Sequence, residues 1–200
     1  MPAMVWPSNI KTRTVDDPLA LRALAHPLRL ELNALVAREG SLTAADAARQ
    51  LGVSHGLASH HLRQLAKYGF IERADAHDSR EHPWRVTATS MDLTPIEPAA
   101  RAPADFIQRH SVEQAAVHLA DWQQRREHED PRWAELAGAT GGLVYLTPDE
   151  LSEVLRAWAA VIEPLAARRP VGHPAQRPAD ATPVSFTLVA VPITRTEHGG

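Results

Sequence analysis

The 200-residue sequence contains no cysteine. Without a thiol, the chain can form no disulfide framework, no thiolate zinc site and no cysteine nucleophile. A complete lack of cysteine fits a reducing compartment. We therefore expect a cytoplasmic protein.

Long apolar runs are also missing. No stretch approaches the roughly 18 consecutive apolar residues that a membrane-spanning helix needs, and residues 1–17 lack the hydrophobic centre of a signal peptide. Hydrophobic residues nevertheless make up 44% of the chain, enough to build a core. The composition predicts a globular protein with no membrane partner.

The sequence motifs of common enzymes are absent as well. There is no His-Glu-x-x-His, no glycine-rich phosphate loop after a strand and no Gly-x-Ser-x-Gly elbow. We expect no catalytic residues, no cofactor and no resident metal, and hence no enzyme.

Acidic residues are missing from one part of the chain. The net charge of −3 argues by itself against a nucleic-acid partner. Residues 1–90, however, carry 11 Lys and Arg against 9 Asp and Glu, whereas residues 91–200 carry 10 against 15. From Ala47 to Ile71 there are three basic residues, three histidines and no acid. This stretch predicts a locally positive surface, which is either a solvated basic face or a nucleic-acid-binding face.

Capping residues and hydrophobic spacing predict a series of short helices in the first half. Asp17 before a proline, Thr43 and Ser54 are placed to begin helices, and Gly40 to end one. The expected helices cover residues 19–25, 27–39, 44–51 and 55–68, and two expected strands cover residues 70–73 and 84–87. A polar hairpin tip over residues 75–81 joins these strands. Three of these helices followed by the hairpin form a winged helix-turn-helix.

The second half has a different pattern. Prolines over residues 91–104 predict a linker. The expected elements after it are a long helix from residue 105, a strand at 143–146, a helix at 149–168 and a strand at 184–194. We therefore expect a mainly α fold with small β content and four parts. These are a tail (1–16), a winged helix-turn-helix DNA-binding domain (17–90), the linker, and a smaller α/β dimerisation and effector unit (105–200).

Two segments of the first half resemble a known family. Leu-Arg-Ala-Leu-Ala-His-Pro-Leu-Arg-Leu at 21–30 and Ser-His-His-Leu-Arg-Gln-Leu-Ala-Lys-Tyr-Gly-Phe-Ile at 59–71 resemble the ArsR/SmtB-type winged helix-turn-helix repressors. The resemblance covers about residues 17–87. It implies a homodimer that binds an inverted-repeat operator in double-stranded DNA and releases it when an effector binds.

The metal sites of that family are not reproduced here. Its founding members sense metals through a cysteine pair on the helix before the recognition helix, and residues 44–51 contain no such ligands. Other members use Asp, His and Glu ligands on a C-terminal helix, where this chain has His110, Glu113, His118 and Asp121. Because His110 and His118 are about two helical turns apart, one ion would need ligands from a partner chain.

The helix expected from residue 55 has the composition of a recognition helix. Leu57, Leu62, Leu65 and Tyr68 are expected to face the core, and His61 to be a structural histidine on the same side. The expected DNA-binding residues are Ser54, His55, Gly56, Ser59, His60, Arg63, Gln64 and Lys67, with Arg80 at the hairpin tip. Ser54 has an alternative role as a helix cap, and Arg80 could pair with the acids beside it. Trp84 is expected to anchor the wing.

Most aromatic residues lie in the second half. Core and dimer packing is one explanation. The other is an apolar pocket for a small organic effector, lined in part by Trp122, Trp133 and Trp158.

Three functions remain open from the sequence. The first is a dimeric DNA-binding transcriptional regulator, a repressor, released by an organic effector. The second keeps the DNA-binding head but senses Ni, Zn or Co through His, Asp and Glu. The third is a winged helix used for protein–protein interaction without an operator.

Overall fold

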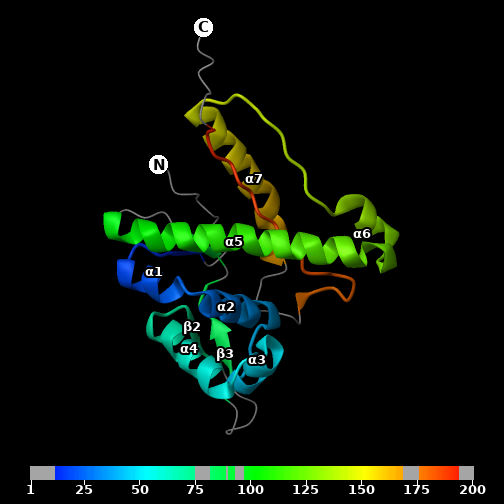
Figure 1. Ribbon diagram of the computed structural model, residues 1–200. Coiled ribbons are helices and arrows are strands. Elements are labelled where there is room, and N and C mark those ends of the chain that lie inside the picture. The colour runs from blue at the N-terminus through cyan, green and yellow to red at the C-terminus, as the bar shows by residue number, and fades with distance from the viewer. Residues whose placement is uncertain (1–11, 75–81, 89, 93–96, 169–175, 194–200) are drawn as a thin grey trace. The chain divides into compact units, whose positions relative to one another are not determined.

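In the computed structural model, residues 12–74, 82–88, 90–92, 97–168 and 176–193 are described (Figure 1). The chain divides into two compact units. One comprises Met1–Ile107 and Gly142–Pro183, and the other comprises Gln108–Gly141 and Val184–Gly200.

Four helices build the N-terminal part of the first unit, here called the head, as the sequence predicts. They are α1 (Pro18–Leu24), α2 (Pro27–Glu39), α3 (Ala44–Leu51) and α4 (His55–Lys67). The expected caps are present, since the side chains of Asp17, Thr43 and Ser54 accept hydrogen bonds from the backbone N–H groups of Leu19, Asp46 and Leu57. The mainly helical fold class with a small antiparallel sheet is confirmed.

A two-stranded antiparallel wing follows α4. Strand β2 (Ile71–Arg73) pairs with β3 (Trp84–Val86), with Glu72 opposite Arg85. Trp84 also exchanges two backbone hydrogen bonds with Leu42, of 2.9 and 3.0 Å, which tie the wing to the segment before α3. Trp84 is only 6% exposed, so its expected role as the anchor of the wing is confirmed. The expected hairpin tip, including Arg80, lies outside the described residues.

A second, parallel strand pair was not expected. Strand β1 (Thr12–Thr14) pairs with β4 (Ser90–Asp92), and Val15 is buried in the core. Thus residues 12–15, within the expected tail, belong to the head. Three residues per strand are too few to show the alternation by which a strand is recognised.

The hydrophobic core of the head lies between the helices and the wing. Its largest fully buried side chains are Leu21, Leu24, Leu32, Leu62, Leu65, Ile71, Val15 and Val36. Ala100 and Ile107 of helix α5 (Pro98–Arg125) belong to the same cluster.

Helix α5 begins inside the expected linker. Pro98 occupies its first position, where the missing N–H costs nothing, but Pro103 lies inside the helix. The helix continues through Pro103 because Ala100, Ala104 and Ile107 bury one side of these turns. The prolines were therefore a misleading linker signal here.

Within the described residues, the regular secondary structure of the C-terminal region is helical. After α5 come the 3-10 helix η1 (Arg126–His128), α6 (Pro131–Leu136) and α7 (Pro148–Arg168). Helix α7 begins with a capping box in which Glu150 Oε2 accepts from the Thr147 N–H at 2.7 Å and Thr147 Oγ1 accepts from the Glu150 N–H at 3.3 Å. Among the described residues, no helix is both long enough and apolar enough to cross a bilayer.

The two strands expected in this region are wrong. Residues 143–146 and 184–193 form no strand, and their large apolar side chains are exposed. Their alternating apolar pattern favours a strand only where a neighbouring strand can satisfy the backbone, and neither segment has such a neighbour within the described part of the chain.

The wing anchor gives a first prediction. We expect Trp84→Ala to lower the free energy of unfolding by about 3–5 kcal/mol, because it opens a cavity at the junction of wing and helices. Chemical denaturation measures this change. The matched control is Arg85→Ala on the same strand, whose exposed ion pair with Glu72 contributes about 1 kcal/mol or less. Equal losses in the two variants would contradict the anchor role.

Candidate nucleic-acid interface

Helices α3 and α4 form the helix-turn-helix. Gly52 ends α3 in the left-handed conformation, with φ of 65°, where a residue with a Cβ is strained. Ser54 then caps α4, its Oγ accepting from the Leu57 N–H at 3.2 Å. The structure therefore supports the capping role of Ser54, which is the alternative to a DNA contact.

The inner face of α4 fixes the helix to the head. Ala58, Leu62 and Leu65 are fully buried, and His61 is 7% exposed. These residues are three and four positions apart and so form one face of the helix. The expectation for Leu57 is wrong, because its side chain is 43% exposed. It lies one position before Ala58, about 100° around the helix and outside the buried face.

The opposite face of α4 carries most of the expected DNA-binding residues. His55, Gly56, His60, Arg63 and Lys67 are exposed, and Ser59 and Gln64 are half-buried. Arg63 Nη1 donates to Ser59 Oγ at 2.9 Å, which holds the guanidinium along the helix. Sequence reasoning missed Leu57 as a member of this exposed surface.

Gly56 has no structural requirement for glycine. A Cβ added there would meet no atom within 4 Å, and its backbone is helical. A glycine inside a helix costs roughly 0.5–1 kcal/mol relative to alanine. The fold therefore gives no reason for this residue, and its visible effect is a first turn of α4 without a side chain at that point.

Positive charge extends from α4 to the wing. The Arg73 guanidinium lies 3.6 Å from the centroid of the Trp84 ring and donates to the His82 carbonyl. Burial, followed by the charge of Arg63, lowers the pKa of Arg73 from its ordinary value. The positive charges of Arg63 and Arg73 are therefore close enough to influence each other. The neighbouring wing residue Arg85 is neutralised by Glu72 at 3.0 Å.

Beneath this face lies a histidine pair. The rings of His61 and His26 have centroids 4.6 Å apart, and each has a buried Nδ1 without a hydrogen-bond partner among the described residues. Burial lowers the pKa of both histidines, and the positive charge of Arg29 lowers it further. The structural role expected for His61 fits its burial. The partner His26 was missed, although it belongs to the first of the two family-like segments.

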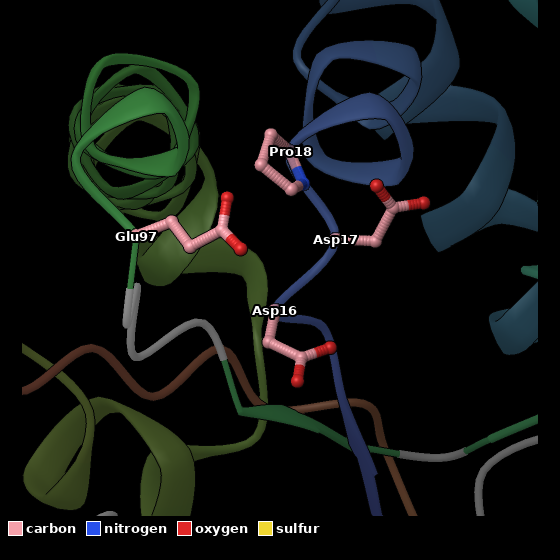
Figure 2. Close-up of a pocket in the computed structure, with 4 residues that line it drawn as sticks. All are labelled: Asp16, Asp17, Pro18 and Glu97. Atoms are coloured by element: carbon pink, nitrogen blue, oxygen red, sulfur yellow. The ribbon is translucent and has the colours of Figure 1, made fainter.

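A pocket of about 340 Å³ lies between the segment before α1 and the start of α5. Asp16, Asp17, Pro18 and Glu97 line it (Figure 2). Asp17 is already used as a helix cap. Three carboxylates repel phosphate, so this pocket is unsuited to nucleic acid.

The tryptophans expected to line an effector pocket are divided between the units. Trp122 and Trp133 belong to the second unit and Trp158 to the first. Trp122 Nε1 donates to the Ala137 carbonyl at 3.3 Å, which ties the end of α5 to the end of α6. The effector pocket stays a prediction. Within the described residues, no three His, Asp or Glu side chains come together as metal ligands.

The histidine pair gives a second prediction. Because its folded-state pKa values lie below the ordinary value of about 6.5, the unfolded chain takes up protons first. The stability they contribute is present above about pH 6.5 and is lost as the pH falls through their folded-state pKa values. We expect His61→Leu to flatten the fall in unfolding free energy between about pH 7 and pH 5.

Denaturation at a series of pH values measures that slope. The matched control is His55→Leu, which removes a histidine outside this pair and is expected to keep the slope. A His61→Leu protein that loses stability in acid as steeply as the unchanged chain would contradict the assignment.

Comparisons with known proteins agree with this geometry. A family model described as a helix-turn-helix domain matches residues 24–74, from the end of α1 through the whole of β2. No curated protein matches the sequence significantly.

Several solved structures are distantly similar. A variant of Lactococcus lactis ZitR in the apo form has a TM-score of 0.33 and 17% identity, and the match covers 70% of this chain and 83% of that one. The adhesin competence repressor AdcR of Streptococcus pyogenes has a TM-score of 0.32 and 17% identity, and the match covers 69% of this chain and 80% of that one. Wild-type MarR of E. coli in the apo form has a TM-score of 0.31 and 17% identity, and the match covers 74% of this chain and 88% of that one. These likenesses are too distant to place the chain in a family. The helix-turn-helix match is therefore what supports a DNA-binding transcriptional regulator.

Proposed function

We propose that this chain is a transcriptional repressor whose helix α4 enters the major groove of operator DNA. The observation that carries the proposal is the outer face of α4. This face carries basic residues and no acid, and its first turn has no side chain at position 56. The opposite face is buried in the core. A helix of this kind fits the width of the major groove.

The side chains of this face divide by chemistry. Ser59, His60 and Gln64 carry the hydrogen-bonding groups that read base edges, whereas Arg63 and Lys67 neutralise phosphates. The exposed Leu57 adds an apolar group that suits a thymine methyl. In the wing, Arg80 is proposed to approach the minor groove, where negative potential attracts arginine.

The first turn of α4 is proposed to make the closest approach to DNA. The amides in the first turn of α4 favour a phosphate, and Ser54 and His55 lie beside them. Glycine at position 56 leaves room there, at a cost to helix stability that the fold itself does not require. Close contact with DNA explains why this cost is tolerated.

One such head makes few contacts, so affinity requires two. We propose a homodimer that binds an inverted repeat with half-sites about one helical turn apart. This is the assembly that the ArsR/SmtB resemblance implies, and in that scheme an organic effector in the C-terminal region releases the operator. A ligand shifts such an equilibrium only by its difference in affinity for the two states.

Arg63 provides the test. We expect Arg63→Ala to weaken binding to an inverted-repeat duplex at least tenfold. It should also reduce the slope of log affinity against log salt by about 0.9 per protomer, because one phosphate contact is lost from each. Anisotropy titrations at several salt concentrations measure both quantities.

The matched control is Arg101→Ala, which removes the same charge from an exposed position on α5. It should leave the salt slope unchanged. If the two variants behave alike, Arg63 contributes only to the overall charge, and α4 is not the face that meets DNA.

A further inference from the structure

Helix α7 has an exposed apolar stripe. Val154, Val161 and Leu165 are 48%, 64% and 48% exposed, and Ala157 lies between them. Residues seven and eleven positions apart fall on one line along an α-helix. Single exposed apolar side chains are ordinary, but a continuous line of them marks an interaction surface.

The stripe is a second apolar face of the same helix. The first face is covered by the chain itself, since Ala159 is 4% exposed and Leu151, Leu155 and Ile162 are half-buried. A helix that is apolar on two sides is expected to be covered on both. The charged residues Arg156 and Glu163 lie on the side opposite the stripe, about 160° or more from Val154.

The charges at the ends of the stripe identify its partner. Glu150 in the first turn and Arg168 in the last turn lie on the same edge of the stripe, about 40° from the line of Val154. In an antiparallel pair of two copies, each Glu150 lies beside an Arg168 of the other copy. A parallel pair would bring the acidic first turns together instead, which is unfavourable.

The apolar and charged residues agree on one register. If Val154 lies opposite Leu165 of the second copy, a two-fold axis passes between residues 159 and 160. The same axis brings Trp158 opposite Val161 of the second copy. It places Glu150 within one residue of Arg168 of the second copy, about 1.5 Å along the helix. Both kinds of contact are therefore satisfied together.

We propose that α7 pairs antiparallel with α7 of a second copy of this chain, through the stripe Val154–Ala157–Val161–Leu165. This interface specifies the homodimer of the proposed function. It rests on α7 alone, however, and stands or falls independently of DNA binding.

The absence of native cysteine makes the test direct. We expect the double variant Val154→Cys/Leu165→Cys to form a covalent dimer with a short bis-maleimide. The two positions of one helix are about 16 Å apart and cannot be joined by it, whereas those of two antiparallel copies face each other. Val154→Cys alone should cross-link poorly. Denaturing electrophoresis measures the yield.

The matched control is Arg156→Cys/Glu163→Cys, which has the same two-fold register on the opposite face of α7. It should remain monomeric on the denaturing gel. In parallel, light scattering of the unmodified chain should give about twice its mass of 21.9 kDa, and Val161→Arg should return it to 21.9 kDa.

Three results would each overturn the proposal. The first is that the control pair cross-links as well as the test pair. The second is that Val154→Cys alone cross-links efficiently, which indicates a parallel pair. The third is that the unmodified chain keeps a mass of 21.9 kDa at tens of micromolar. Circular dichroism of each variant checks that the helices are intact. A dimer joined at α7 that binds no DNA would leave this inference standing and remove the proposed function.

Discussion

The head of this molecule depends on how one face of α4 packs against the core. Ala58, Leu62 and Leu65 are fully buried, and α4 packs against α1, α2, α3 and strand β2 of the wing. Because the backbone of a helix is rigid, burying these positions determines which residues face outward. The inner face therefore sets the orientation of Arg63, His60 and Lys67 toward solvent. The wing is joined to the same core through Trp84, so that the charge of Arg63 acts on Arg73 across the two elements.

Each face of α4 has a feature that is unfavourable for the stability of the fold. Inside, His61 and His26 each bury a ring nitrogen that has no partner among the described residues, and burial lowers the pKa of both histidines. Outside, Gly56 weakens the first turn although the fold has space for a side chain. Sites that lose stability without structural benefit are typical of functional surfaces. A second exposed surface is the apolar stripe of α7, in which Val154, Val161 and Leu165 are about half or more exposed.

Local signals in the sequence predicted the head well. Asp17, Thr43 and Ser54 are read as caps because capping depends on residues only a few positions away, and all three cap in the structure. Failures came where the outcome depends on distant partners. The polar strand β1 exists only because β4 lies beside it, and residues 184–193 form no strand since no strand among the described residues pairs with them. Pro103 suggested a linker because burial of its neighbours is invisible in local sequence. The DNA-contacting roles themselves remain predictions.

Selection of bound duplexes from a random DNA pool by the full chain tests whether α4 reads DNA sequence. We expect enrichment of a two-fold symmetric sequence whose half-sites are about 10 base pairs apart, centre to centre. Bound pools that remain random in sequence, or no retained DNA at low salt, would contradict it.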